Sequence, residues 1–215
     1  MFMDKVIKHK NDIFMIVGYM VVTAIIGTIL NDGLVLFLTI NMFLAGVAWG
    51  ISVIIEMLDE HHAKKWVIII LTIVWILFFP NLIYITTDFV HLQNYQFFEI
   101  YAQSYMFIFS DWLVFFIIFV GAMISANLGV KSIKKILNVW HIDQSIKYIY
   151  LLVLFIVSSI GIYIGRFIRL NSWDFYRLDI IFNGIFSRFT FFLGFIFIFT
   201  IIHFIYFAIF NKNEK

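Results

Sequence analysis

Six long apolar runs dominate this chain, and each is long enough to cross a membrane. A bilayer core about 30 Å thick requires about 20 mostly apolar residues in a helix. Hydrophobic residues make up 63% of the sequence and charged residues only 13%, whereas soluble domains are about 45–50% apolar. Because a membrane-spanning segment must satisfy its own backbone hydrogen bonds, the runs predict α-helices. We therefore expect an all-α polytopic bundle of six spans, forming one domain over residues 1–215.

The hydropathy pattern also gives the expected limits of the spans. The first run is long for a signal-peptide core and no small-x-small cleavage site interrupts it, which predicts a retained helix. The stretch from Asp88 to Ser110 is too long to lack structure, and its aromatic side chains suit the headgroup layer. We expect an interfacial helix there, between the third and fourth spans. The expected spans are residues 12–31, 34–56, 66–87, 111–130, 147–165 and 188–210.

Lysine and arginine occupy different parts of the chain. All eleven lysines lie in the two terminal tails and in the connections after the second and fourth spans, which share one side of a six-span bundle. By the positive-inside rule that side is the cytoplasm, so both termini are expected there. All four arginines lie in one segment on the opposite side. Arginine's planar fork binds carboxylate or phosphate through two parallel hydrogen bonds, which lysine cannot do, so this segment indicates a need for that geometry.

A first group of polar residues lies at the outer end of the third span. Pro80 is the only proline in the chain; it lacks a backbone N–H and predicts a kink, and Asn81 is placed to bond the carbonyl that the kink frees. Tyr84, Asp88 and His91 follow at spacings of four and three, on one face of a continuing helix. A polar face so close to the hydrocarbon core is expected to contact protein or water. Asp88 and His91 are the candidate catalytic pair, since a carboxylate beside an imidazole suits proton exchange.

A second group follows the fifth span. Gly161 and Gly165 form a small-x-x-x-small pair, which predicts the close approach of another helix. Arg166 and Arg169 are three residues apart and share a face if the helix continues. The following residues predict the end of that helix and a cap on the next segment. Two polar residues of this stretch join the candidates for ligand binding, namely Asn171 and Asp174.

Two interpretations of the outer charges stay open. Counting about 20 residues across the core from each lysine-bearing end places charges of four helices at a similar outer depth. The arginines either pair with outer aspartates and fix the loops, or at least one binds the phosphate or carboxylate of a lipid headgroup, an envelope precursor or a solute. The candidate ligand-binding residues are Asn81, Tyr84, Asp111, Arg166, Arg169, Asn171, Asp174 and Arg188.

Several function classes find no support in the sequence. The absence of cysteine excludes disulfides and thiol chemistry, and no phosphate-binding glycine loop or metalloprotease motif is present. Asp88 and His91 are a weak metal pair that nearby arginines would oppose, so no metal or cofactor is expected, and nothing suggests nucleic-acid binding. No charged residue lies near a predicted midplane, which argues against a pump built on buried carboxylates. Asn41 and His203 are expected to form interhelical hydrogen bonds.

The two polar groups resemble the signature stretches of a bacterial membrane family, domain of unknown function 1361. The stretches are Phe79–His91 (FPNxxYxxTDxxH) and Gly161–Asp174 (GxYxGRFxRxNSWD). The resemblance covers the chain from about the second span onward and implies a bacterial multi-pass protein of the cell membrane, without an established activity. Many members place Ala-Pro after the Pro-Asn pair; Leu82 and Ile83 stand there in this chain, so its kink depends on Pro80 alone.

Two functions remain open on the sequence alone. In the first, a polar outward-facing pocket binds an anionic lipid-linked or envelope ligand, with Arg166 and Arg169 holding the anion and Asp88 and His91 orienting it or exchanging protons. Transport and group transfer both fit this hypothesis. In the second, the protein is a non-catalytic membrane scaffold or assembly partner, and the same residues form structural ion pairs. The expected partners are membrane lipids and, in the first case, an anionic small molecule or lipid-linked ligand.

Overall fold

In the part of the chain that the structure describes, six helices are long and apolar enough to cross a membrane. The computed structural model describes residues 9–99, 101, 103–170, 174 and 176–211. The expectation of an all-α bundle with six spans is confirmed, and this is the architecture of a multi-pass membrane protein. The elements are α2 (Lys10–Leu30), α3 (Gly33–Glu60), α4 (Lys65–Phe78), α5 (Asn81–Tyr84), η1 (Ile85–Asn94), β1 (Phe98–Glu99), β2 (Ser104–Tyr105), α6 (Phe109–Val139), α7 (Gln144–Tyr163), η2 (Ile164–Ile168), α8 (Leu178–Phe186) and α9 (Phe189–Phe210).

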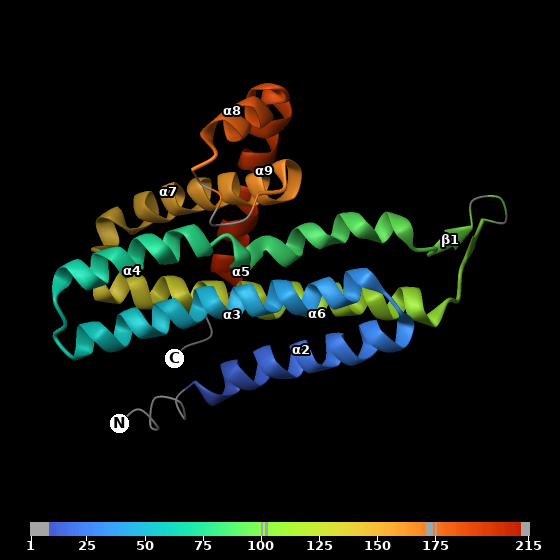
Figure 1. Ribbon diagram of the computed structural model, residues 1–215, viewed down its shortest axis with the longest axis horizontal. Helices are drawn as coiled ribbons and strands as arrows, with labels where there is room; N and C mark the ends of the chain where they lie inside the picture. Colours follow the sequence, from blue (N-terminus) through green and yellow to red (C-terminus); the bar gives the residue numbers. More distant parts are fainter. Residues whose placement is uncertain (1–8, 100, 102, 171–173, 175, 212–215) are drawn as a thin grey trace.

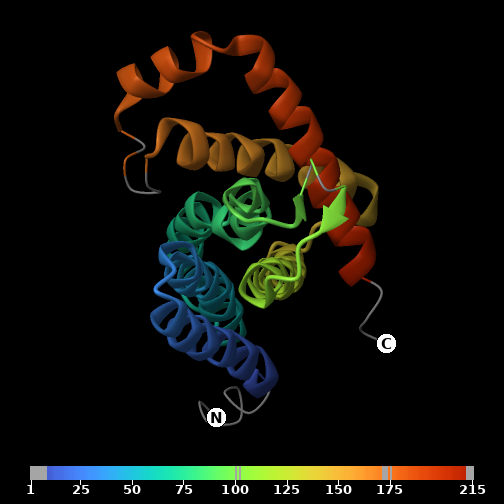
Figure 2. The same ribbon diagram turned by 90° about the vertical axis from the view of Figure 1, so that its right-hand side faces the viewer.

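The spans form two parts that meet along the third span. Helices α2, α3 and α6 pack side by side, and the broken helix α4–α5–η1 lies against α3 and α6 (Figures 1 and 2). Helices α7 and α9 pack on each other and cover the other side of the broken helix, and the short helix α8 connects them at one end (Figure 2). His203 Nε2 of α9 lies 2.9 Å from the Ser158 hydroxyl of α7, which confirms the expected interhelical hydrogen bond.

The third span breaks at its proline. Helix α4 ends at Phe78, and the Asn81 side chain donates to the Phe78 carbonyl at 2.9 Å, so it satisfies a carbonyl at the break, although not the one four residues before Pro80. Helix α7 passes directly over this break, because a Cβ atom on Gly161 would lie only 2.6 Å from Pro80 Cγ. The predicted close approach at the glycine pair is therefore that of the third span, with the proline itself at Gly161.

The segment after the third span differs from the expectation of a separate interfacial helix. The span instead continues as a 3₁₀ helix to Asn94 and is followed by a two-stranded antiparallel hairpin, in which Phe98 pairs with Tyr105. Aromatic side chains favour strands as well as interfaces, and the rings of this pair lie 5.5 Å apart across the hairpin. The Tyr95 hydroxyl also donates to Asp32 Oδ2 at 2.8 Å, which ties the segment to the start of α3.

The fourth span is longer than expected at its lysine-bearing end. Helix α6 continues to Val139, past the predicted limit at residue 130. Its basic side chains find partners on neighbouring helices: Lys131 Nζ lies 2.6 Å from Asp12 Oδ1, and Lys135 forms an ion pair with Glu56. Because these contacts neutralise the lysines where α6 packs on α2 and α3, the helix continues beyond the apolar run.

Candidate functional site

The end of α7 changes conformation where it carries its arginine. Residues Ile164–Ile168 form a π-helical turn, and Arg169 follows it with a left-handed backbone, φ 62°. Such π turns are frequent at functional sites because they redirect side chains from a helix. A Cβ atom on Gly165 would lie 3.1 Å from Tyr84 Cε2, so this glycine lets the tyrosine ring lie close to the turn. The Arg166 guanidinium then stacks over that ring, 4.8 Å from its centre.

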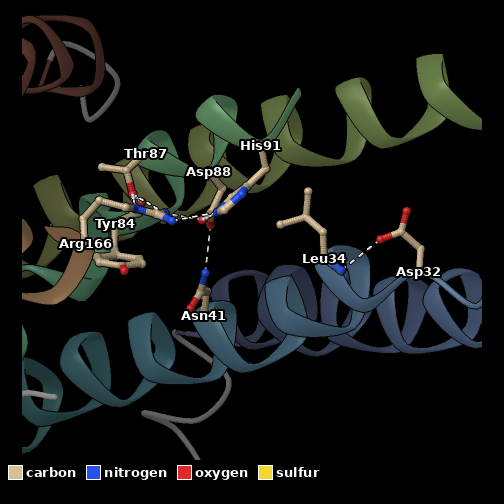
Figure 3. Close-up of polar contacts among 8 residues, drawn as sticks. All are labelled: Asp32, Leu34, Asn41, Tyr84, Thr87, Asp88, His91 and Arg166. Atoms are coloured by element: carbon tan, nitrogen blue, oxygen red, sulfur yellow. Dashed lines mark hydrogen bonds and ion pairs between the residues drawn. The ribbon is translucent and has the colours of Figure 1, made fainter. Parts of the chain in front are cut away.

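Arg166 engages the third span with most of its donors. Its Nε donates to Thr87 Oγ1 at 2.9 Å, its Nη1 donates to His91 Nε2 at 2.8 Å, and its Nη2 forms an ion pair with Asp88 (Figure 3). The Asp88 side chain is fully buried and that of Arg166 is 12% exposed. A lysine has a single nitrogen and could not reach these partners together, so the geometry accounts for an arginine at this position.

Four side chains of α5 and η1 reach Arg166, and they approach it in two rows. Residues three apart eclipse in a 3₁₀ helix, so Tyr84 and Thr87 form one row and Asp88 and His91 form the adjacent row. Arg166 lies along both rows (Figure 3). Together the four positions follow the i, i+3, i+4, i+7 pattern of one helical face, so the spacing that grouped Tyr84, Asp88 and His91 also includes Thr87, which was not among the candidate residues.

Asp88 also ties this group to α3. Its second oxygen accepts a hydrogen bond of 2.8 Å from Asn41 Nδ2, and Asn41 is itself buried. The interhelical hydrogen bond expected of Asn41 is therefore present, although its partner lies 47 residues away and was not foreseen. Both carboxylate oxygens of Asp88 are engaged. We call Asn41, Tyr84, Thr87, Asp88, His91 and Arg166 the Arg166 cluster.

His91 is neutral in this arrangement. A guanidinium has only donors, so the His91 Nε2 that faces Arg166 must be an acceptor, and the ring proton belongs on Nδ1. The same Nε2 lies 4.0 Å from Asp88 Oδ1, and the side chain is 34% exposed. Among the residues that the structure describes, no three histidine or carboxylate side chains converge as metal ligands. The cluster is therefore a cation held by an aspartate, with an imidazole at its edge.

A cavity of about 930 Å³ opens beside the cluster, between α3 on one side and α7 and η2 on the other. This volume is near the upper end of the roughly 300–1,000 Å³ of small-molecule sites. Most of the lining is apolar, and Phe37, Ile40 and Phe43 of α3 are each about half exposed. Asn41, on the α3 wall of the cavity, lies about 12 Å along the helix from its first residue, Gly33, at a rise of 1.5 Å per residue. The polar residues that line the cavity are Asn41, Asn81, Tyr84, His91, Arg166 and Arg169.

The remaining candidates lie elsewhere or outside the described residues. Asp111 accepts a hydrogen bond of 2.7 Å from the backbone N–H of Gln96 and so holds the segment before the hairpin. Arg188 is exposed where α9 begins, and neither it nor Asp174 lines the cavity. Asn171 lies outside the residues that the structure describes. The similar outer depth inferred from span counting therefore does not bring these residues to the Arg166 cluster.

The two polar stretches of the sequence, Phe79–His91 and Gly161–Asp174, both contribute to this site, and both lie in the region that matches a known family. No curated protein and no solved structure matches the chain. The family model described as "Protein of unknown function (DUF1361)" matches residues 40–206, which include every member of the Arg166 cluster. The resemblance carried by Phe79–His91 and Gly161–Asp174 is therefore confirmed, and α2 lies outside the matched region. Since the match covers most of the sequence, the chain belongs to this family, DUF1361.

Proposed function

We propose that this protein binds an anionic amphipathic ligand, lipid-linked or from the cell envelope, in the cavity beside the Arg166 cluster. One observation carries the proposal: a single cavity joins a polar wall that bears two arginines to apolar walls. The apolar side chains of α3 that line it are about half exposed and lie on a membrane-spanning helix, so they offer an apolar tail a surface to pack on. A ligand with an anionic head and an apolar tail satisfies both walls at once.

The residues of the cluster have different roles in this proposal. Asp88 has both oxygens engaged and is fully buried, so it acts as a positioning residue that fixes the Arg166 fork. His91 lines the cavity, and with its Nε2 accepting from Arg166 it offers its other ring nitrogen as a hydrogen-bond donor that orients the anionic group of a ligand. This assignment suits transport and group transfer alike, because both require an anion to be held in a fixed orientation.

The orientation of the bundle belongs to the same proposal. The lysine-bearing helix ends face the cytoplasm of a bacterial cell and the arginine-bearing end faces outward, as the positive-inside rule requires. The ligand then comes from the outer leaflet of the cell membrane or from the envelope beyond it. Both termini lie in the cytoplasm in this orientation.

A scaffold function is the second candidate, and one observation favours it. The Arg166–Asp88–Asn41 chain of contacts joins η2, η1 and α3, so it locks three parts of the bundle together without any ligand. A structural lattice of this kind needs no cavity. The two functions therefore differ in whether blocking the cavity matters.

Ile40→Trp tests the proposal, because Ile40 lines the cavity and is 54% exposed, so a larger side chain fits there without disturbing the core. The matched control is Ile29→Trp on α2, where the side chain is 76% exposed and does not line the cavity. Native mass spectrometry of the full chain, purified in neutral detergent, measures the anionic lipids that remain bound. We expect wild type and Ile29→Trp to retain an anionic lipid that Ile40→Trp loses. Equal retention by all three, or no retained anionic lipid, would support the scaffold instead.

A further inference from the structure

The two arginines of the cavity differ in whether a carboxylate neutralises their charge. The charge of Arg166 is countered by Asp88, and its donors also reach Thr87 and His91. Arg169 lines the same cavity and is exposed, and among the described residues it has no hydrogen-bond or ion-pair partner. The net positive charge at the polar end of the cavity therefore comes from Arg169.

The local backbone explains why Arg169 can serve the cavity. Its left-handed conformation, φ 62°, ends the π turn, and such a conformation is uncommon for a residue other than glycine. The turn and this residue together bring both arginines to one cavity, although only Arg166 contacts η1. Left-handed residues that are not glycine persist where the surrounding structure requires them, and here the result is a guanidinium fork at the cavity wall.

Other donors surround the same end of the cavity. The His91 Nδ1 carries the ring proton, and the Tyr84 hydroxyl has no hydrogen-bond partner among the described residues. Together with the Arg169 fork they offer several N–H and O–H groups to an acceptor. A phosphate or carboxylate with multiple acceptor oxygens matches this set, and the fork binds either in a bidentate manner.

The apolar part of the cavity runs along a membrane-spanning helix. Leu34 and Leu44 mark the two ends of its α3 wall, about 15 Å apart along the helix at 1.5 Å per residue. Between them, Phe37 and Ile40 line the cavity and are each about half exposed. In a bilayer such a wall continues into the layer of lipid tails, so a ligand tail need not cross a polar surface to enter.

We infer that Arg169, rather than Arg166, holds the anionic group, and that the ligand is a membrane lipid with a phosphate or carboxylate head whose tail enters sideways between α3 and η2. The inference rests on the proposed function and adds to it the anchoring residue, the route of entry and the class of ligand. Arg166 then acts as a positioning residue that keeps η2 and the Tyr84 ring in place.

The test uses the full chain in neutral maltoside detergent with two probes, dodecyl phosphate and inorganic phosphate, and measures binding by isothermal titration calorimetry. Arg169→Gln removes the fork and its charge, and Arg169→Lys keeps the charge without the fork. Arg188→Gln is the matched control, since Arg188 is an exposed arginine outside the cavity. Retention of each variant as a single peak in size-exclusion chromatography verifies folding.

We expect wild type and Arg188→Gln to bind dodecyl phosphate equally. Arg169→Gln should bind about tenfold to a hundredfold more weakly, because hydrogen bonds to charged groups are worth about 1.5–3 kcal/mol each. Arg169→Lys should lie between them, and inorganic phosphate should not bind measurably.

Each contrary result has a separate meaning. Unchanged binding by Arg169→Gln overturns the role of Arg169 and leaves the proposed function standing. Inorganic phosphate binding as tightly as dodecyl phosphate overturns the lipid as ligand and shows a site for soluble anions. Failure of wild type to bind dodecyl phosphate, with dodecanoate as the carboxylate counterpart also failing, overturns the proposed function and this inference with it.

Discussion

The buried ion pair makes a prediction that depends only on the structure of the cluster. Asp88→Asn keeps the size of the side chain but removes its charge, and it leaves the Arg166 guanidinium, 12% exposed, without a counter-ion. Removing one partner of a buried ion pair typically costs about 3–5 kcal/mol. Because Asp88 is fully buried and Arg166 is nearly so, we expect a loss in that range, about 4 kcal/mol, in the free energy of unfolding.

A double variant separates the charge from the side chain itself. Replacing both members of the pair leaves no charge buried without a partner, which is the main cost of each single substitution. Asp88→Asn combined with Arg166→Gln should therefore be about 3 kcal/mol less destabilised than the sum of the two single variants. Unfolding in mixed micelles with increasing sodium dodecyl sulfate, followed by far-ultraviolet circular dichroism, measures wild type, Asp88→Asn, Arg166→Gln and the double variant.

The control for this cycle is Arg188→Gln, an exposed arginine at the start of α9. Surface substitutions of this kind change stability by about 0.5 kcal/mol or less. The reasoning is refuted if Asp88→Asn is as stable as that control. It is also refuted if the double variant is as unstable as the sum of the two single variants, because the two charges then do not act as a pair.

Three further predictions concern the fold around the cluster. Gly161→Ala should destabilise the protein by about 1–3 kcal/mol, since the new Cβ atom would lie 2.6 Å from Pro80 Cγ; Gly194→Ala, which meets no atom within 4 Å, should not, and the same unfolding assay compares them. A cysteine at Tyr101, which is 97% exposed, should react with an impermeant maleimide on intact cells, whereas one at His62 should react only after permeabilisation; the reverse pattern would invert the orientation. Burial, and next the hydrogen bond to Asp32, raise the pKa of Tyr95. The neutral hydroxyl therefore contributes fully to stability below about pH 10, the ordinary tyrosine pKa. This contribution is lost only as pH rises through the higher pKa of the folded protein. Phenolate absorbance, as wild type minus Tyr95→Phe, should show that late titration, and Asp32→Asn should shift it to lower pH.

The spans were predictable because the bilayer imposes the same requirement on every segment that crosses it. Every segment in the hydrocarbon must be apolar and must satisfy its own backbone, and this requirement can be read one run at a time. The close approach at Gly161 was predictable for the same reason, since small residues at that spacing admit a neighbour whatever its identity. Which neighbour it admits, the Pro80 break, depends on the packing of the whole bundle.

The ends of the spans depended on contacts that a run of residues does not contain. Helix α6 extends through Lys131 because Asp12 lies beside it, and these residues are 119 positions apart. The hairpin after η1 formed where an interfacial helix was expected, since the same aromatic residues suit both, and the hydrogen bond from Tyr95 to Asp32 that precedes it joins positions 63 residues apart. Such pairings over long separations are what hydropathy cannot supply.

Only part of the candidate site could be predicted from the sequence. The α-helical period placed Tyr84, Asp88 and His91 on one face, and the arginines stood out because the rest of the chain uses lysine. Thr87 lies on that same face, three residues after Tyr84, but its role as a partner of Arg166 was not predicted. Asn41 joins only because α3 packs against η1, so its role as the second partner of Asp88 needed the structure.

A structure of the full chain in nanodiscs that contain an anionic phospholipid would show whether a lipid occupies the cavity. We expect density of a lipid there, with its phosphate at the Arg169 fork and one tail lying along α3 between Leu34 and Leu44, while Arg166 keeps its contact with Asp88. A cavity that holds only water, or that side chains have closed, would contradict this expectation.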